Sequence, residues 1–480
     1  MTMNVDGVGG WIERWARTDG DRVAIVFGDT RLVYADLASR IRRLAHGLRS
    51  LGVGKGDRVV WTGPNHPAFL ETLFAAAKLG AVLVPIDHRL EQDAIQRLLD
   101  HVGARAVRSA DRAHEALIAN HPDTPIGERI DPDDLCLMPF TSGTTGSTKG
   151  VMLTHANLTW NAINSVSSLD IRSDDVGLAV APFFRAGGTG ITVLPVLLRG
   201  GAVVIAPRPD PDDVLRLIEQ QQVTLGFANP DLLEALVRSR RWRVADLGSI
   251  RAFVVGGART RERLLRECAE RGVPVFEGYG LSEAAPFVAV LDEENAALKT
   301  GSVGRPALFV DIRVVTADGV DRTPGEIGEL LVRGPNVMAG YWNATDGSRR
   351  VNDAHDWLHT GDAACIDADG FLFIVGRMAD AYDVAGTAVH PGTAERVLLT
   401  HEAVVEACVI GGAEGATAHV VLGPIASAGV EAELRALLET LPVHARPTAI
   451  TYVASLPKNA NGKILRRRLS PPPQHEGERV

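Results

Sequence analysis

Short apolar runs alternate with amphipathic stretches between residues 57 and 306. The runs "DRVVWTG", "GAVLVPI", "GGAVVIAP" and "RAFVVGG" are rich in β-branched residues and bounded by glycine or proline, which predicts strands. Between them, "PDDVLRLIEQQ" and "RERLLRECAERG" repeat apolar residues at helical spacing. This alternation favours an α/β fold whose sheets are mostly parallel and covered by helices, with ligands at the carboxyl ends of the strands.

The pattern changes twice further along the chain. From Val310 to Ile374, strands and turns follow one another, as in "VDIRVV", "GELLVRG" and "GFLFIVG", which predicts a small barrel-like β unit. Beyond Gly376, mixed patterns predict a compact α+β unit. We therefore expect a large N-terminal domain over 1–379, with its β-rich subdomain over 310–375. A small mobile C-terminal domain is expected over 380–469, and a disordered tail over 470–480.

One apolar stretch, "AFLETLFAAAKLGAVLVPI", is long enough to raise the question of a membrane span. It is interrupted by Glu71 and Lys78, and a glycine divides it. The pattern predicts a buried helix, a turn at Gly80 and a strand, and does not favour a transmembrane helix. The opening residues lack the pattern of a secretory signal, and "WIERWART" predicts an amphipathic first helix instead.

Bulk composition adds few constraints. The chain has 480 residues, of which 45% are hydrophobic and 23% charged, as in a globular protein of several domains. The net charge of -9 argues against a general nucleic-acid binder but not against a small anionic ligand. The cysteines have no metal-site spacing and indicate a reducing cytoplasm. The sequence does not indicate an oligomeric state.

The segment "TSGTTGSTKG" directly follows the apolar run "LCLMPF". Glycines let backbone N–H groups converge on an anion, while hydroxyls and a lysine add donors and charge. The Walker pattern fails, because Thr148 precedes Lys149 and Gly150 follows it. A flexible linker is the plainer alternative, although linkers rarely follow a buried strand so closely. The predicted phosphate-binding residues are Thr141, Ser142, Gly143, Thr144, Thr145, Gly146 and Lys149.

Two further glycine turns each stand between a predicted strand and a helix. In the first, "VVGGART", the small turn would let a flat ring lie against the backbone, although taken alone a plain tight turn is the preferred interpretation. In the second, "VFEGYGLSEAAP", Tyr279 could stack on a base and Glu283 could bind the magnesium of a triphosphate. The candidate nucleotide-binding residues are Gly256, Gly257, Ala258, Glu277, Gly278, Tyr279, Gly280, Leu281 and Ser282.

Three charged residues downstream complete the candidate site. Asp362, after a glycine, could accept from two vicinal ribose hydroxyls, and Arg377 could reach ribose or phosphate oxygens. In isolation both are ordinary turn residues. Lys463 follows an Asn-Gly turn in "LPKNANGKILRRRL", which projects it from a fixed position. The arginines at 466–468 are interpreted as a solvated basic tail.

Taken together, these motifs have the order and spacing of a known family. "TSGTTGSTKG", "GYGLSE", "GELLVRGPNVMAGYWN", "HTGD", "GRMADAY" and "LPKNANGKILRRRL" resemble the adenylate-forming superfamily, and in particular its acyl-CoA synthetases. The resemblance extends from about "LVYADLASRIRRLAHGL" to Leu469.

The resemblance implies an ATP-dependent carboxylate–CoA ligase. The acid attacks the α-phosphate of Mg·ATP to give an acyl-adenylate and pyrophosphate, and coenzyme A then takes the acyl group and AMP leaves. By position, Glu283 matches the magnesium ligand and Asp362 the ribose-binding carboxylate, with Arg377 its helper. Lys463 matches the lysine at the reacting carboxylate, and Asp380 the hinge of the small domain. The predicted catalytic residues are Thr141, Glu283 and Lys463.

The acyl pocket is expected around "APFFRAGGTG". Its predicted lining is Phe184, Arg185, Gly187, Gly188 and Phe227, with Phe287 nearby. A peptide-synthetase domain would carry an aspartate soon after "APFF", so amino-acid substrates are disfavoured. The motifs do not distinguish an acyl-CoA synthetase from a luciferase-like oxygenase, although nothing in the sequence favours the oxygenase. The sequence does not identify the acid.

Several positions depart from the family pattern. Arg185 stands where most relatives have a histidine, and Ala379, Asp383 and Ala385 alter the hinge segment. Structural drift explains these changes most simply. Alternatively, one half-reaction is impaired, and a partner ligase supplies a ready-made acyl-adenylate. A third interpretation, from a different class, is a catalytically idle protein that binds an acyl-adenylate.

Overall fold

The computed structural model describes residues 7–142, 148–343, 355–412, 415–458 and 464–469. Its largest sheet has nine strands in the order β15-β14-β13-β12-β11-β9-β10-β1-β2. The six central strands, β13, β12, β11, β9, β10 and β1, pair in parallel. Antiparallel strands lie at the two edges, β14 and β15 at one and β2 at the other. Their bounds are β1 Val23–Phe27, β2 Thr30–Val33, β9 Val176–Ala179, β10 Ala202–Ile205, β11 Leu225–Ala228, β12 Ala252–Gly256, β13 Val275–Gly280, β14 Phe287–Val290 and β15 Arg305–Pro306.

A second sheet of the N-terminal part has the order β18-β8-β6-β4-β3-β5, with β7 paired to β8. Strands β3 to β6 are parallel, whereas β8 runs antiparallel to its three partners, β6, β7 and β18. The α/β architecture predicted from the sequence is thus confirmed. The bounds are β3 Arg58–Thr62, β4 Val82–Ile86, β5 Ala104–Arg108, β6 Leu135–Leu137, β7 Phe140–Ser142, β8 Thr148–Thr154 and β18 Gly340–Tyr341.

Helices cover these sheets, and several begin directly after a strand. The helix after β11 has proline at its first position, and the Asn229 side chain accepts a hydrogen bond from the Leu232 N–H, which caps that helix. The predicted helix over 211–221 is confirmed. The helices of this part are α1 Trp11–Thr18, α2 Tyr34–Ser50, α3 Pro67–Lys78, α4 Gln92–Val102, α5 Arg112–Ala119, α6 His155–Ser168, α7 Ala186–Gly190, α8 Val193–Arg199, α9 Pro211–Gln221, α10 Pro230–Arg238, α11 Glu262–Glu270 and α12 Glu293–Ala296.

The segment predicted to be β-rich forms a four-stranded antiparallel sheet in the order β16-β17-β19-β20. Further along the chain, a three-stranded sheet, β23-β24-β25, packs against helices α13 and α14 around a separate apolar core. A hairpin of β21 and β22 precedes that core. The bounds are β16 Asp311–Val315, β17 Gly328–Arg333, β19 Leu358–Ile366, β20 Leu372–Arg377, β21 Tyr382–Val384, β22 Thr387–Val389, β23 Val404–Ile410, β24 Thr417–Leu422, β25 Ala449–Tyr452, α13 Pro391–Leu399 and α14 Val430–Leu438.

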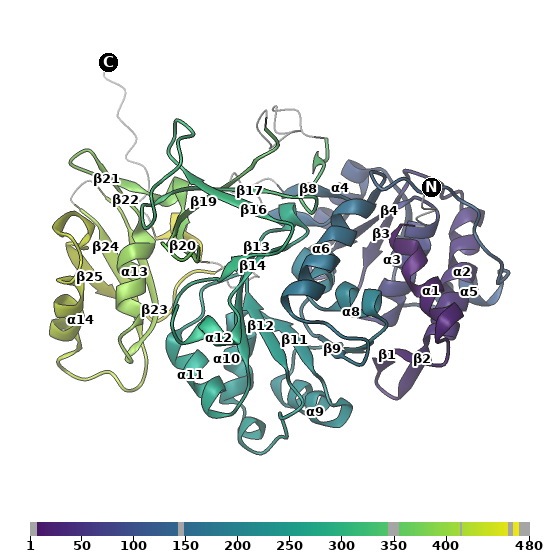
Figure 1. Cartoon of the computed structure of the whole chain (residues 1–480), viewed down its shortest axis with the longest axis horizontal. Helices are drawn as coiled ribbons and strands as arrows, with labels where there is room; N and C mark the ends of the chain where they lie inside the picture. The colour runs from purple at the N-terminus through teal and green to yellow at the C-terminus, as the bar shows by residue number, and fades with distance from the viewer. Residues whose placement is uncertain (1–6, 143–147, 344–354, 413–414, 459–463, 470–480) are drawn as a thin grey trace.

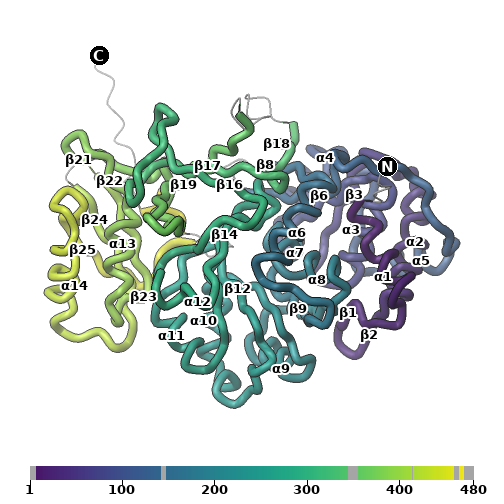
Figure 2. Tube along the Cα trace, viewed as in Figure 1, coloured from purple at the N-terminus to yellow at the C-terminus, as the bar shows by residue number. Residues whose placement is uncertain are grey.

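The first helices and the C-terminal α+β part lie at opposite ends of the described molecule. Figure 1 shows α13 and α14 at one end, α1, α2 and α5 at the other, and the nine-stranded sheet between them. The tube in Figure 2 shows the same arrangement as a continuous trace. Strand β20 contacts α13, so the four-stranded sheet adjoins the C-terminal part.

The apolar stretch over 68–86 folds as predicted, into α3, a turn at Gly80 and β4. Glu71, which is 1% exposed, binds Arg40 at 2.6 Å and His114 at 2.7 Å. Lys78 pairs with Glu13 at 3.0 Å. Both interrupting charges are therefore paired inside a folded protein. Within the described residues, no helix combines the length and apolar character needed to cross a membrane.

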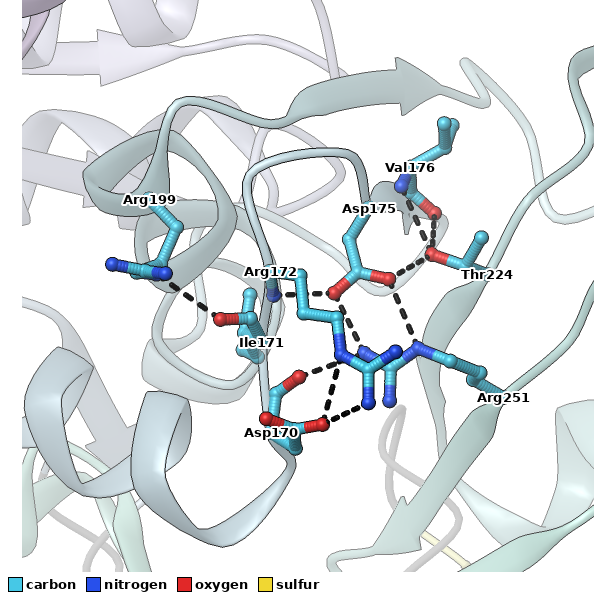
Figure 3. A network of polar contacts seen from close by, with 8 residues as sticks. All are labelled: Asp170, Ile171, Arg172, Asp175, Val176, Arg199, Thr224 and Arg251. Atoms are coloured by element: carbon cyan, nitrogen blue, oxygen red, sulfur yellow. Dashed lines mark hydrogen bonds and ion pairs between the residues drawn. The ribbon is translucent and has the colours of Figure 1, made fainter.

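A buried carboxylate ties together the amino ends of three parallel strands (Figure 3). Asp175, which is 3% exposed, binds Arg251 through two contacts of 2.6 and 3.2 Å and accepts the Thr224 hydroxyl at 2.7 Å. These residues directly precede β9, β11 and β12. The network lies at the edge opposite the carboxyl ends, so it stabilises the sheet away from the candidate site.

Candidate functional site

A carboxylate, a phenol and a guanidinium meet where the nine-stranded and four-stranded sheets adjoin. Asp362 and Arg377 are directly paired residues of β19 and β20, and Arg377 Nε lies 3.1 Å from Asp362 Oδ1. The Tyr279 hydroxyl donates to Asp362 Oδ2 at 2.6 Å. Burial and the adjacent carboxylate raise the pKa of Tyr279 well above its ordinary value, so the phenol remains a donor. The sequence predicted these three residues for one site, and the fold brings them together.

Thr360 holds this group in place. Its backbone carbonyl accepts from Arg377 at 2.8 Å, and its hydroxyl accepts from the backbone N–H of Asp362 at 3.0 Å. The same hydroxyl donates to the Leu330 carbonyl on β17. A carboxylate offers about four acceptor positions, so Asp362 can accept from more than its protein partners. Sequence reasoning missed Thr360, although it precedes the Gly-Asp pair in "HTGD".

The two glycine turns form one edge of the same site. Gly256, at the end of β12, pairs with Gly278 on β13. A side chain at Gly256 would meet the Gly278 carbonyl oxygen at 2.8 Å, and one at Gly280 would meet the Pro286 carbonyl oxygen at 1.7 Å. Residues other than glycine would therefore clash with the neighbouring backbone at these strand ends, so no side chain covers the backbone there. Nearby residues predicted to bind the nucleotide are Gly257 and Ala258 in the first turn, and Leu281 and Ser282 after β13.

Glu277 stands on β13 beside a pocket shared by the N- and C-terminal parts. Arg259, Thr260 and Gly301 line it from one side, and Arg396 and Thr400 from the other. Burial raises the pKa of Glu277 to about 7, and the charge of Arg259 opposes the rise. Glu277 is thus a carboxyl group that exchanges a proton near neutral pH.

Glu283 lies next to the predicted phosphate segment. Its Oε1 accepts the Tyr341 hydroxyl at 2.7 Å, and Lys149 Nζ lies 5.0 Å from the centroid of the Tyr341 ring. Lys149 is paired with Thr141 across β7 and β8, and Tyr341 with Val151 across β18 and β8. The fold thereby brings Thr141, Lys149 and Glu283 into one region. Sequence reasoning missed Tyr341, which only this antiparallel pairing places there.

The carboxylate of Glu283 fits a magnesium ion. Its second oxygen has no hydrogen-bond partner among the described residues, and hard cations prefer such oxygen ligands. Backbone pairing places Ser142 opposite Thr148. Five predicted residues, Gly143, Thr144, Thr145, Gly146 and Lys463, lie outside the described residues.

Lys458, which precedes the undescribed residues 459–463, lies beside α10. Lys458 and Ile464 form an antiparallel bridge. Lys458 Nζ lies 2.8 Å from Glu406 and 3.8 Å from Asp231, which is in the first turn of α10. Because α10 begins at the carboxyl end of β11, this end of the chain approaches the edge at which the glycine turns lie.

The predicted hinge residue is held by an ion pair. Arg466 Nε lies 3.1 Å from Asp380 Oδ2, and the same guanidinium binds Glu395 at 2.7 Å and the Val409 carbonyl at 2.9 Å. The interpretation of Arg466 as part of a solvated tail was therefore wrong, because three protein acceptors surround its charge. Arg467 and Arg468 are exposed.

Ala385 occupies a strained turn. It has φ = 52° and the next residue, Gly386, has φ = 82°, in the two-residue loop between β21 and β22. Two positive φ values are typical of a type I′ turn, which strongly favours glycine, asparagine or aspartate. Asp383 accepts a hydrogen bond from the Gly386 N–H at 3.0 Å. Asp383 therefore supports the turn in addition to changing the charge of the segment.

The predicted acyl-pocket residues lie between the two sheets. Phe227, at the carboxyl end of β11, is partly exposed, and a side chain at Gly187 would meet its ring at 3.1 Å. The same ring would lie 3.7 Å from a side chain at Gly256. Gly188 packs tightly on the Pro182 carbonyl. Phe287 is 2% exposed in the main core, so it contributes packing.

Comparison with known proteins decides the family. The profile of the AMP-binding enzymes matches residues 12–342, and that of the AMP-binding enzyme C-terminal domain matches residues 393–463. This chain belongs to the AMP-binding enzyme family. Members of this family that form CoA thioesters provide the relatives below.

Relatives of this AMP-binding enzyme cover nearly its whole length. Feruloyl-CoA synthase of Amycolatopsis sp is 39% identical over 97% of this chain and 98% of that protein. Indoleacetate–CoA ligase of Aromatoleum aromaticum is 34% identical over 95% of this chain and 96% of that protein. The structure of anthranilate CoA ligase with anthranoyl-AMP has a TM-score of 0.88, at 25% identity and 96% coverage of both chains. That of o-succinylbenzoate CoA synthetase from Bacillus subtilis with its acyl-adenylate has a TM-score of 0.85, at 29% identity and 96% and 98% coverage.

This AMP-binding enzyme is an acyl-CoA synthetase. It activates a carboxylic acid with ATP and Mg²⁺ as an acyl-adenylate and transfers the acyl group to coenzyme A. The predicted family, reaction and cofactors are thus confirmed. The comparisons do not favour a split reaction with a partner ligase or an idle adenylate-binding protein.

Proposed function

We propose that this acyl-CoA synthetase activates an aromatic carboxylic acid. The relatives named above carry feruloyl, indoleacetate, anthranilate and o-succinylbenzoate in their names, and each of these acids contains an aromatic ring. The observation that carries the proposal is the position of Phe227. Its partly exposed ring lies against Gly187 of the acyl segment and close to Gly256 of the nucleotide segment. An aromatic acid would stack there beside the nucleotide.

For the nucleotide, we assign the ribose to Asp362. The ion pair with Arg377 and the hydrogen bond from Tyr279 fix the orientation of this carboxylate, which would accept from the vicinal hydroxyls. The bare backbone of Gly256 and Gly278 would receive the flat base.

For the phosphates, we assign Thr141, Lys149 and Glu283. Thr141 and Lys149 come from paired strands, and Glu283 would offer its second oxygen to the metal. Magnesium would supply charge stabilisation at the α-phosphate when it is bound. Tyr341 orients Glu283 by its hydrogen bond, so it is a positioning residue. Lys463 is proposed to meet the reacting carboxylate, as the family motif implies.

A panel of acids tests the aromatic assignment. Pyrophosphate release and CoA thioester formation would be measured for trans-3-phenylpropenoic acid, 3-cyclohexylpropanoic acid and octanoic acid. We expect the highest kcat/KM for the planar aromatic acid, by about fivefold, since a well-placed aromatic contact contributes about 1 kcal/mol beyond its burial. Equal values for the cyclohexyl acid, or a preference for octanoic acid, would refute the assignment.

Two variants sharpen this test. Phe227→Leu keeps an apolar wall but removes the ring, so the aromatic preference should fall while ATP affinity is kept. Lys463→Ala should lower adenylate formation with every acid by about 10² to 10³, because one charge-stabilising donor is lost. It should affect transfer from a synthetic acyl-adenylate much less.

We also propose a cytoplasmic location. Cys136, Cys268, Cys365 and Cys408 are all free thiols, as expected in a reducing compartment. Fractionation of cells with an antibody to the native chain would test this.

A further inference from the structure

Arg185 is a partly buried cation in the segment that forms the acyl-pocket wall. Its guanidinium carbon lies 5.3 Å from the centroid of the Phe184 ring, and the Phe184 side chain is itself buried. Burial lowers the pKa of Arg185, which reports the cost of keeping this charge away from water. Among the described residues, no carboxylate or carbonyl oxygen accepts a hydrogen bond from its guanidinium.

The carboxylate whose charge acts on Arg185 is already occupied. Asp87 follows β4 and binds Arg89 through two contacts of 2.8 Å, Nε to Oδ1 and a terminal nitrogen to Oδ2. The Arg89 guanidinium also lies 5.3 Å from the Phe184 ring centroid. The group of Asp87, Arg89 and Arg185 therefore contains two guanidinium groups and one carboxylate. Arg89 has its bidentate partner, so the uncompensated charge belongs to Arg185.

The position of this charge connects it with the acid substrate. Asp87 follows the carboxyl end of β4 and Arg185 follows the loop after β9, so the group lies where the carboxyl ends of the two sheets meet. Two residues beyond Arg185, Gly187 faces the ring of Phe227. The cation is therefore part of the same short segment as the wall assigned to the aromatic acid.

We propose that Arg185 determines substrate specificity by binding a second carboxylate of the acid, in addition to the carboxyl group that is activated. A wholly apolar acid would bury the guanidinium further without supplying an acceptor, which is costly. A dicarboxylic acid would supply the planar, bidentate partner that arginine prefers. The proposal rests on the proposed aromatic acid pocket and names the class within it, aromatic dicarboxylic acids.

A matched set of acids tests the proposal. The set comprises 3-phenylpropenoic acid, its 4-carboxy derivative and the 4-methoxycarbonyl derivative, which has nearly the same shape without the charge. With the wild-type enzyme we expect kcat/KM for the 4-carboxy acid to exceed that for the ester by at least about tenfold. Arg185→Gln should abolish this ratio, and Arg185→Lys should retain part of it. Arg172→Gln, a surface arginine at the opposite edge of the sheet, should leave the ratio unchanged.

Further measurements separate the competing explanations. Unchanged AMP affinity in Arg185→Gln would show that the site is folded. If Arg185→Gln instead raises the KM for coenzyme A equally with all acids, the cation serves a phosphate of coenzyme A and the proposal is overturned. Equal kcat/KM for the acid and the ester in the wild type would also overturn it. Octanoate and octanedioate form a second pair: if only these are activated, the aromatic assignment fails while their ratio still decides the role of Arg185.

Discussion

Asp380 and Arg466 form an ion pair across 86 residues of sequence, with Nε and Oδ2 3.1 Å apart. The pair joins the proposed hinge to the residues that directly follow Lys463. Glu395, on α13, binds the same guanidinium. The proposed hinge residue and α13 are therefore both bound to one side chain near the C-terminal end of the described chain.

We predict that Arg466→Met slows adenylate formation at least about tenfold. The substitution leaves two carboxylates without their cation, and breaking a buried pair costs about 3–5 kcal/mol. The link from Arg466 to the proposed hinge residue Asp380 is lost with it. ATP–pyrophosphate exchange measures the step, and AMP affinity should change little because the ribose site lies on other strands. Arg468→Met, at an exposed position, is the control; an equal loss there would contradict the prediction.

Asp362→Ala should weaken ATP and acyl-adenylate binding together. Hydrogen bonds to a charged group contribute about 1.5–3 kcal/mol each. Tyr279→Phe removes one donor to the carboxylate without removing the charge, so its effect should be smaller, roughly tenfold in Kd. Titration calorimetry with AMP measures both variants. Unchanged affinity for both nucleotides in Asp362→Ala would remove the ribose assignment.

The stability of the unliganded protein should depend on Glu277. Its pKa is raised to about 7 in the folded state, so the folded protein binds the proton more tightly than the unfolded chain does. The free energy of unfolding that this tighter proton binding adds is fully present below about pH 4.5 and is lost as the pH rises through 7. Glu277→Gln should therefore gain about 1–3 kcal/mol relative to the wild type between pH 5 and 8. Denaturant unfolding across that range measures it, and a pH-independent difference would refute the argument.

Ala385→Gly should stabilise the β21–β22 hairpin. Alanine at positive φ is strained by about 1–2 kcal/mol, and the greater freedom of glycine in the unfolded chain offsets about 0.4–1 kcal/mol of the relief. Slower amide exchange across residues 382–389 in the native protein would report the gain. In the reverse control, Gly386→Ala should speed exchange, because it adds a second side chain at positive φ.

Asp175→Asn tests the network opposite the site. The substitution leaves Arg251 without its carboxylate, and we expect a loss of about 3–5 kcal/mol in unfolding free energy. Asp170→Asn is the matched control, because its ion pair with Arg172 is fully exposed and its loss should leave the unfolding free energy nearly unchanged. Activity well below the unfolding transition should be kept in both. Thermal and denaturant unfolding would show whether the two variants differ.

Local sequence signals predicted most of the fold and the strand-end residues of the site. The stretch over 68–86 showed its helix, turn and strand through spacing and Gly80 alone, because those elements depend on near neighbours. Tyr341 and Thr360 were missed because their roles arise from hydrogen bonds to residues 58 and 30 positions away in the sequence. Arg466 was misinterpreted because three adjacent arginines suggest solvent, whereas its acceptors come from 57 to 86 residues away.

The pairing of Asp362 with Arg377 has a mechanical consequence. Arg377 ends β20, three residues before Asp380, and is clamped both to Asp362 and to the Thr360 carbonyl. With Asp380 as the proposed hinge, any rotation must start from a residue that the sheet immobilises. The change in backbone torsion angles is therefore confined to a few peptide units. The small domain would rotate about a defined axis, unlike a domain that is joined by a long flexible linker.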